Sequence, residues 1–193
     1  GTDYVDELLA STAFMNANPA GYQHDLVISG AAAQRLIDDW SNPDNPNEGF
    51  VLHATMPAVD KGNRLGLYGA DNPDTEGINE SPHMIVVFSA HPAEMTFEYA
   101  NRASNKETRP ELDQGNFGAL VVGEIQSSNE SIRFSSQLRF DVSELTFRSI
   151  NSAAIRLTSL EHKPERLDFT MMAYLMGSAN AGWDDYASFG SRD

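Results

Sequence analysis

The sequence predicts an all-β fold: an antiparallel jelly-roll β-sandwich with one short helix near residues 30–40. Apolar and polar residues alternate with a period of two in about nine or ten short segments, which is typical of half-buried strands. Clusters of Gly, Pro, Asn and Asp separate these segments, and a helical period is found in one stretch. A chain of 193 residues buries one sizeable core, so we expect residues 1–193 to form one jelly-roll domain.

The clearest alternation lies in residues 131–160. In the first part of this stretch, apolar residues such as Leu138 and Phe140 share one parity, and Arg139 takes the other. Asp141 and the serine two residues later can hydrogen-bond their own backbone, which favours a turn. We therefore interpret residues 131–160 as a core hairpin of two strands joined by a short connection.

The N-terminal part of the chain mixes loop, strand and helix signals. Residues 1–24 have no clean period, and we expect them at the surface. Their second half reads as loop, whereas the part that contains Val5, Leu8 and Leu9 can form a short helical turn or a strand. Residues 25–29 read as a short strand, and Ser29 is a suitable N-cap for the helix that follows. The apolar positions that share one face of this helix are Ala33, Leu36, Ile37 and Trp40. Two prolines and three asparagines predict a loop over residues 41–49.

The remaining strands follow from the same alternation. They are expected at residues 50–56, 64–69, 83–89, 93–100, 116–126 and 166–176. The charged, turn-rich residues 101–115 predict a long connection, and residues 177–193 predict a loop around Trp183.

Charge and composition exclude several classes of partner. The chain has 28 acidic and 13 basic residues, a formal charge of −15, so we expect no binding to nucleic acid. No apolar run approaches the length of a membrane span, so we expect no membrane insertion. Cysteine is absent, which excludes disulfides and thiolate metal sites within this sequence. Gly1-Thr2-Asp3 does not open a signal peptide, and we expect the sequence to be a mature, trimmed or excerpted chain.

The sequence carries no recognisable catalytic motif. It lacks the Gly-x-Ser-x-Gly elbow, the His-Glu-x-x-His zinc motif and the phosphate-binding Gly-x-x-x-x-Gly-Lys loop. The carboxylate pairs Asp38-Asp39 and Asp184-Asp185 are adjacent in sequence, which is not the facing geometry of glycosidases. We therefore predict that the chain is not an enzyme.

One acidic loop resembles the first part of a calcium-binding loop. Residues 72–80 place oxygen-bearing side chains at alternate positions with Gly77 in the sixth place, but the twelfth place holds His83 instead of a bidentate Glu. The candidate calcium ligands in and beside this loop are Asp71, Asp74, Glu76 and Glu80. The alternative is a solvated acidic loop without a bound ion.

Three aromatic residues are candidates for ligand binding. Trp40, Trp183 and Tyr68 can each present a flat face to a sugar ring. For the two tryptophans, packing at the edge of the core is the favoured alternative, because each adjoins the end of a predicted element.

Several of these segments share motifs with a known family of extracellular modules. The segments are residues 25–27, 36–40, 47–52, 64–67, 82–88, 116–123, 139–143 and 150–157. Together they resemble DNRLRE-type jelly-roll domains, which overlap a carbohydrate-binding-module family attached to alginate lyases and to archaeal cell-surface proteins. The resemblance implies a jelly-roll fold and a location outside the cell or on its surface.

The order of the motifs differs from that of the family. Residues 1–90 resemble the later half of a module, and residues 91–193 resemble the early half. Either the module is circularly permuted, or the chain is one period of a tandem array or of a fibre whose neighbouring subunits complete each other's sandwich. The repeat or fibre is favoured, because it requires no permutation of the gene.

The resemblance therefore implies a non-catalytic extracellular structural or adhesive repeat of a cell-surface stalk or fibre, with copies of itself as partners. The alternative is a carbohydrate-binding module appended to a polysaccharide-degrading enzyme, with a polysaccharide as partner.

Overall fold

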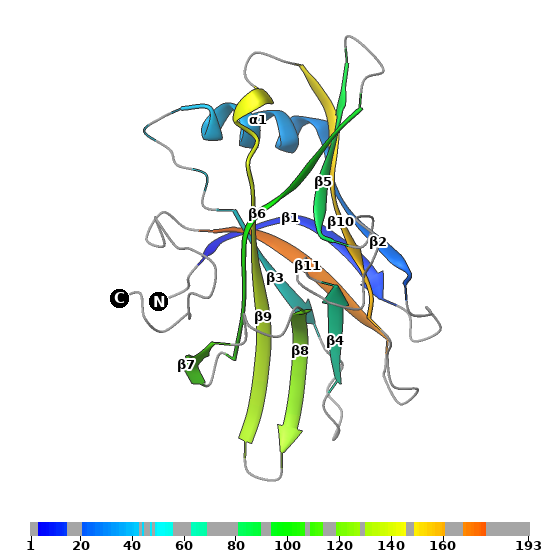
Figure 1. Ribbon diagram of the computed structural model, residues 1–193, viewed down its shortest axis with the longest axis vertical. Helices are drawn as coiled ribbons and strands as arrows, with labels where there is room; N and C mark the ends of the chain where they lie inside the picture. The colour runs from blue at the N-terminus through cyan, green and yellow to red at the C-terminus, as the bar shows by residue number, and fades with distance from the viewer. Residues whose placement is uncertain are drawn as a thin grey trace.

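Strands make up most of the described chain. The computed structural model describes residues 4–14, 21–42, 44, 47, 49–55, 63–68, 81–89, 94–106, 109–113, 119–127, 130–145, 149–160 and 168–176 (Figure 1). The elements are β1 (Tyr4–Phe14), β2 (Gln23–Ile28), α1 (Gly30–Trp40), β3 (Phe50–Thr55), β4 (Asn63–Tyr68), β5 (His83–Phe88), β6 (Glu94–Lys106), β7 (Arg109–Asp113), β8 (Ala119–Ser127), β9 (Glu130–Phe140), a 3-10 turn (Ser143–Leu145), β10 (Ile150–Thr158) and β11 (Phe169–Met176).

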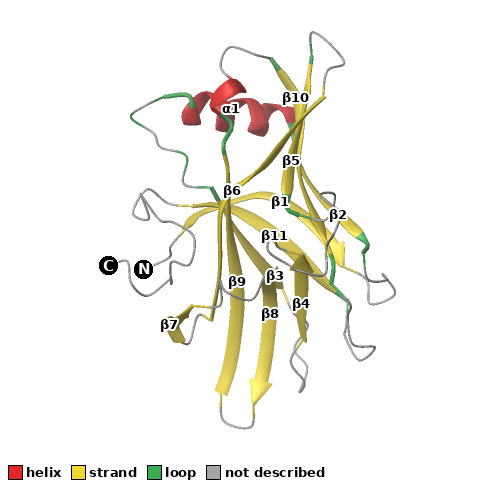
Figure 2. Ribbon diagram, viewed as in Figure 1, coloured by secondary structure: helices red, strands yellow, loops and turns green. Residues whose placement is uncertain are grey.

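The strands form two antiparallel sheets, which confirms the predicted sandwich with one short helix (Figure 2). Sheet A has the order β1-β11-β3-β9-β6, with β8 and β4 beside the first part of β9 and β7 beside the end of β6. Sheet B has the order β2-β10-β5-β6. Successive strands pass repeatedly from one sheet to the other, as they do in a jelly roll.

Strand β6 belongs to both sheets. Its first residues, Glu94 to Glu98, pair with β5, whereas Tyr99 and the residues after it pair with β9. The register shifts between Tyr99 and Asn101, where the strand passes from sheet B to sheet A. Figure 1 shows β6 running from the side of β5 to the side of β9.

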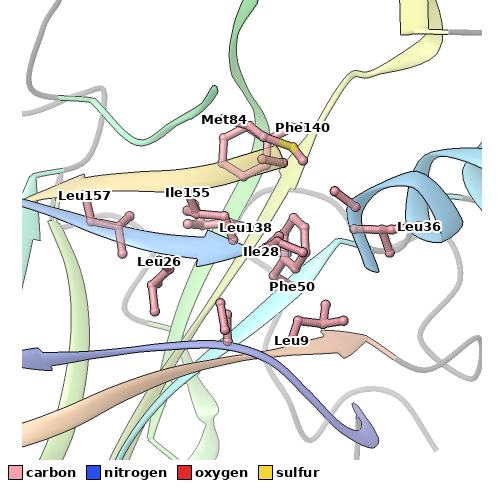
Figure 3. Close-up of a cluster of buried hydrophobic side chains, with 14 of the residues drawn as sticks. Leu9, Leu26, Ile28, Leu36, Phe50, Met84, Leu138, Phe140, Ile155 and Leu157 are labelled. Atoms are coloured by element: carbon pink, nitrogen blue, oxygen red, sulfur yellow. The ribbon is translucent and has the colours of Figure 1, made fainter. Parts of the chain in front are cut away.

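The core lies between the inner faces of the two sheets. Sheet B contributes residues such as Leu26, Met84 and Ile155, and sheet A contributes Phe50 and Phe140 (Figure 3). These five side chains are fully excluded from solvent. Burial of each side chain of this size contributes about 1.5–3 kcal/mol, so the inner faces supply most of the stability.

Helix α1 closes one end of this core. Its N-cap is Ser29, whose Oγ accepts a hydrogen bond from the backbone N–H of Ala32 at 3.4 Å. Leu36 and Ile37 on its apolar face belong to the core, as the spacing predicts. The side chain of Gln34 accepts a hydrogen bond from the backbone N–H of Ile150 at 2.7 Å, which fixes the helix against β10.

A tight turn before β3 sets this strand against β9. Gly49 has a φ of +83°, and a Cβ there would lie 2.2 Å from the backbone oxygen of Leu138, so another residue would not fit. Asn47 donates to the backbone oxygen of Phe140 at 2.6 Å and accepts from the N–H of Gly49 at 3.0 Å. The Asn-x-Gly sequence therefore positions the first core residue of β3.

The predicted hairpin over residues 131–160 is wrong in its pairing, although both strands exist. β9 pairs with β3, β6 and β8 in sheet A, whereas β10 pairs with β2 and β5 in sheet B. Between them, Asp141 accepts a hydrogen bond from the backbone N–H of Ser143, and Leu145 is buried. The connection thus crosses from one sheet to the other, and its leucine is part of the core.

Strands lie in one segment whose structure the sequence left open and in one segment predicted as a connection. Within residues 1–24, β1 pairs with β11 along Tyr4–Phe14, and its register shifts on both sides of Leu8. These irregularities interrupt the two-residue period, which hides the strand in the sequence. Residues 101–106 continue β6, and β7 follows in the predicted connection over residues 101–115. Backbone hydrogen bonds join β1, β6 and β7 to their neighbouring strands. Such bonds do not depend on side-chain type, so the alternation of apolar residues does not predict them.

The two halves of the sequence interleave within one chain. β3 and β5 come from residues 1–90, and they pair with β9, β11, β6 and β10 from residues 91–193. Tyr4 lies opposite Met176, so the first and last described residues are neighbours in sheet A. Residues 131–160 therefore pair with residues 23–28, 50–52 and 83–88 of their own chain.

Candidate functional site

The sequence-predicted calcium ligands and one of the tryptophans lie outside the described residues. These are Asp71, Asp74, Glu76, Glu80 and Trp183. Within the described ranges, no group of three or more His, Asp or Glu side chains has the geometry to hold a metal ion. The calcium site stays a prediction from the sequence.

The two described aromatic candidates are well separated. Trp40 is half-buried at the end of α1, and its ring packs edge-to-face on Phe50 with a centroid distance of 5.3 Å. Tyr68 is half-buried at the end of β4, opposite Ala119 of β8. Figure 1 places α1 and β4 in different parts of the molecule.

An ion pair occupies the outer face of sheet B. The Nε and one terminal guanidinium nitrogen of Arg156 each donate to a carboxylate oxygen of Asp25 at 2.7 Å. The side chains are 32% and 38% exposed, respectively, so the pair is partly screened by water. His83 lies on the other side of Arg156 in the strand register, which makes a row of three ionisable side chains across the sheet.

This ion pair shifts the pKa values of both residues. The hydrogen bonds from Arg156 hold the pKa of the Asp25 carboxyl below its usual value, and the nearby His83 and His24 act in the same direction. The same hydrogen bonds, with the charges of Asp25 and Glu94, raise the pKa of Arg156. Strand β2 therefore presents no unneutralised carboxylate, because Asp25 is its only acidic residue.

The inner face of the same strand carries a histidine. His24 is 2% exposed, and its ring lies 4.8 Å from that of Tyr22. Burial lowers the pKa of His24, and the adjacent Asp25 opposes this shift. Burial at the core side of β2 therefore favours the neutral imidazole over the charged one.

Exposed large apolar side chains are found on or beside the edge strands of both sheets. The large hydrophobic residues classed as exposed in the described part are Leu8 on β1, Tyr22 before β2 and Val27 on β2, with exposed fractions of 51%, 45% and 60%. β1 is the edge of sheet A and β2 is the edge of sheet B. This pair of edges, residues 4–14 and 22–28, is the candidate functional surface.

A second group of side chains lies on the outer face of sheet A. The rings of His53 on β3 and Tyr174 on β11 pack edge-to-face with a centroid distance of 5.8 Å. The Tyr174 hydroxyl and Thr55 Oγ1 donate to Met172 Sδ at 3.5 Å and 3.3 Å. Both rings are half-buried, so part of each aromatic surface remains accessible.

The sequence alone did not identify the Asp25–Arg156 pair. Both residues have the outward parity of their strands, and this signal is visible in the sequence. Their contact depends on the register between β2 and β10, which are 131 positions apart in the chain at these residues.

No helix of the described part is long and apolar enough to span a membrane. Comparison of the chain with models of protein families, with curated proteins and with solved structures gives no match.

Proposed function

We propose that the chain is a non-catalytic structural or adhesive repeat of an extracellular stalk or fibre, with copies of itself as partners. The observation that supports this proposal most is that the edge strand of each sheet carries an exposed large apolar side chain, Leu8 on β1 and Val27 on β2. An edge strand with such a side chain offers a surface for contact with another protein. The motif resemblance to DNRLRE-type surface modules supports the extracellular location.

Electron microscopy of the purified native material tests this proposal. Filaments or stalks with a repeating subunit are the expected result, and a flanking copy of the module in the full-length protein would agree with them. A uniform monomer that binds a glycan tightly would contradict the proposal.

A carbohydrate-binding module is the second candidate function. The edge-to-face pair of His53 and Tyr174 on the outer face of sheet A supports it, because accessible aromatic surface can stack on sugar rings. Affinity electrophoresis against acidic and neutral polysaccharides tests this candidate. Retardation that Tyr174→Ala abolishes and Tyr22→Ala leaves unchanged would favour it over the fibre.

Calcium is the predicted cofactor of either function. We expect millimolar calcium to raise the melting temperature, because a bound cation would neutralise the acidic loop that contains Asp74. Asp74→Ala should remove this rise, whereas Asp44→Ala in a different acidic loop should retain it. Calorimetry with calcium and with a chelator measures the shift, and an unchanged melting temperature would exclude the site.

A further inference from the structure

We propose that Met172, on the outer face of sheet A, is an oxidation site, where a peroxide converts the thioether to a sulfoxide whose oxygen is held by the hydroxyls of Tyr174 and Thr55. This inference goes beyond the proposed function and does not depend on it.

The position of Met172 distinguishes it from its neighbours in β11. Met171 and Ala173 are fully buried in the core between the two sheets, whereas Met172 and Tyr174 point to the opposite face, because successive residues of a strand alternate. Met172 is partly exposed, and it lies opposite His53 of β3 in the strand register. A peroxide in solution can therefore reach this side chain from outside the sandwich.

The other described methionines face the core. Three of them have exposed fractions of at most 3%: Met84, Met171 and Met176. Met95 is partly exposed, but it shares the parity of the buried Phe97 and packs against the core. Met15 and Met56 lie outside the described residues. Because oxidation requires access of the oxidant to the sulfur, we expect Met172 to be the most reactive of the described methionines.

Two hydroxyl groups lie against the Met172 sulfur. The Tyr174 hydroxyl donates to Sδ at 3.5 Å, and Oγ1 of Thr55 donates to the same atom at 3.3 Å. Tyr174 belongs to the same strand and Thr55 to the neighbouring strand β3, so the pairing of β11 with β3 brings both hydroxyls to the sulfur.

These two donors suit a sulfoxide better than a thioether. A thioether sulfur is a weak acceptor, whereas a sulfoxide carries a polar oxygen. Hydroxyl hydrogens rotate to suit their acceptor, so both hydroxyls can turn from the sulfur to the new oxygen. Oxidation of Met172 therefore strengthens two hydrogen bonds that are already aimed at the right place.

The reaction needs no group other than the peroxide. A lone pair of the Met172 sulfur attacks one peroxide oxygen, so that an S–O bond forms and the O–O bond breaks. The proton on the transferred oxygen passes to the departing hydroxide, which leaves as water. The sulfur is oxidised by two electrons, and the peroxide is reduced by two.

The outer face also makes the product tolerable. A sulfoxide at the fully buried Met171 would place a polar oxygen among apolar side chains, which is costly. At Met172 the oxygen accepts from Tyr174 and Thr55 at a partly exposed position. The fold should therefore withstand oxidation at Met172.

Peptide mass mapping after graded treatment with hydrogen peroxide tests the site. We expect Met172 to form its sulfoxide about tenfold faster than Met84, Met171 and Met176, because these three are enclosed in the core. If Met172 reacts no faster than Met171, the proposal is wrong.

The melting temperatures of reduced and oxidised protein test the role of the hydroxyls. Each variant is compared with its own reduced form, so the effect of the substitution itself cancels. We expect oxidation to lower the melting temperature of Thr55→Val and of Tyr174→Phe by about 3 °C more than that of the wild type, since each variant lacks one donor to the sulfoxide. Thr170→Val is the matched control and should behave like the wild type, because Thr170 is exposed on the same face of β11.

Met172→Leu controls for oxidation elsewhere in the chain. This variant retains the other six of the seven methionines, so it measures the shift that they produce. If the oxidation effect that remains after subtraction is equal in the wild type, Thr55→Val and Tyr174→Phe, the hydroxyls do not hold the sulfoxide and the proposal is overturned.

Discussion

The edge strands of the two sheets differ in length and in the regularity of their pairing. β1 ends sheet A as a long strand with irregular register around the exposed Leu8, whereas β2 ends sheet B as a short, regular strand with the exposed Val27. Bulges on an edge strand hinder pairing with another chain. The comparison teaches that two edge strands with similarly exposed apolar side chains can differ in the regularity of their backbone pairing, because register depends on the neighbouring strand and not on the exposed face.

The inner faces of the two edges should differ most in their contribution to stability. Leu26 of β2 is fully buried, and Leu9 of β1 is 9% exposed at the rim of the core. We expect Leu26→Ala to lower the free energy of unfolding by about 3–5 kcal/mol and Leu9→Ala by about 2 kcal/mol, since a better-enclosed cavity collapses less. Urea denaturation of both variants measures the difference. Equal losses would show that the two edges are equally enclosed.

The Asp25–Arg156 ion pair of β2 should contribute less to the free energy of unfolding than the burial of Leu26. We expect Asp25→Asn to lower the free energy of unfolding by about 0.5–1 kcal/mol at neutral pH, because the partners are partly exposed. The folded pKa of Asp25 is lowered, so this stabilisation is present above the unfolded value of about 3.9. It is lost as the pH falls through the folded pKa.

Denaturation at neutral and acidic pH, at low and high salt, measures the contribution of the pair. The exposed Ser11 of β1 provides the control, and Ser11→Ala should change the free energy of unfolding little. A wild-type advantage over Asp25→Asn that persists unchanged at pH 2 would contradict an origin in the ion pair.

The smallest expected effect is a pH dependence from the buried histidine of β2. Burial lowers the folded pKa of His24, so the unfolded chain binds more protons below an unfolded pKa of about 6.5. Stability should therefore fall as the pH drops through this value, until the folded pKa is reached. His24→Leu should flatten this part of the profile, whereas His83→Leu on the outer face should retain it. A profile that is identical in wild type and His24→Leu would refute the assignment.

The candidate site was only partly predictable from the sequence. The acidic loop and Trp183 were visible as motifs, but they lie outside the described residues. Trp40 was predicted to adjoin the end of a helix, and the structure adds its contact with Phe50, which a local pattern cannot specify. The Asp25–Arg156 pair and the exposed edge were not predicted, because both depend on which strands become neighbours.

The buried polar residues illustrate the same limit. Ser136 is fully buried at the point where β9 changes its neighbour from β8 to β3. Its Oγ donates to the backbone oxygen of Val121 at 2.8 Å and accepts from the N–H of the same residue at 3.0 Å. The Ser136 hydroxyl thus supplies hydrogen bonds to the backbone of Val121 at the position where β9 changes its partner strand. A serine within a strand pattern does not indicate this role in the sequence.

The sequence by itself determined the all-β class, the strand segments with clear alternation, and the helix with its Ser29 cap. These features depend on local spacing and capping, which are properties of consecutive residues. The tertiary structure decided that β9 and β10 belong to different sheets, that β1 is a bulged strand, and that β2 is the straight edge beside a neutralised ion pair. These features depend on pairing between residues distant in sequence, because hydrogen bonds between strands join backbone groups that carry no information about their partner.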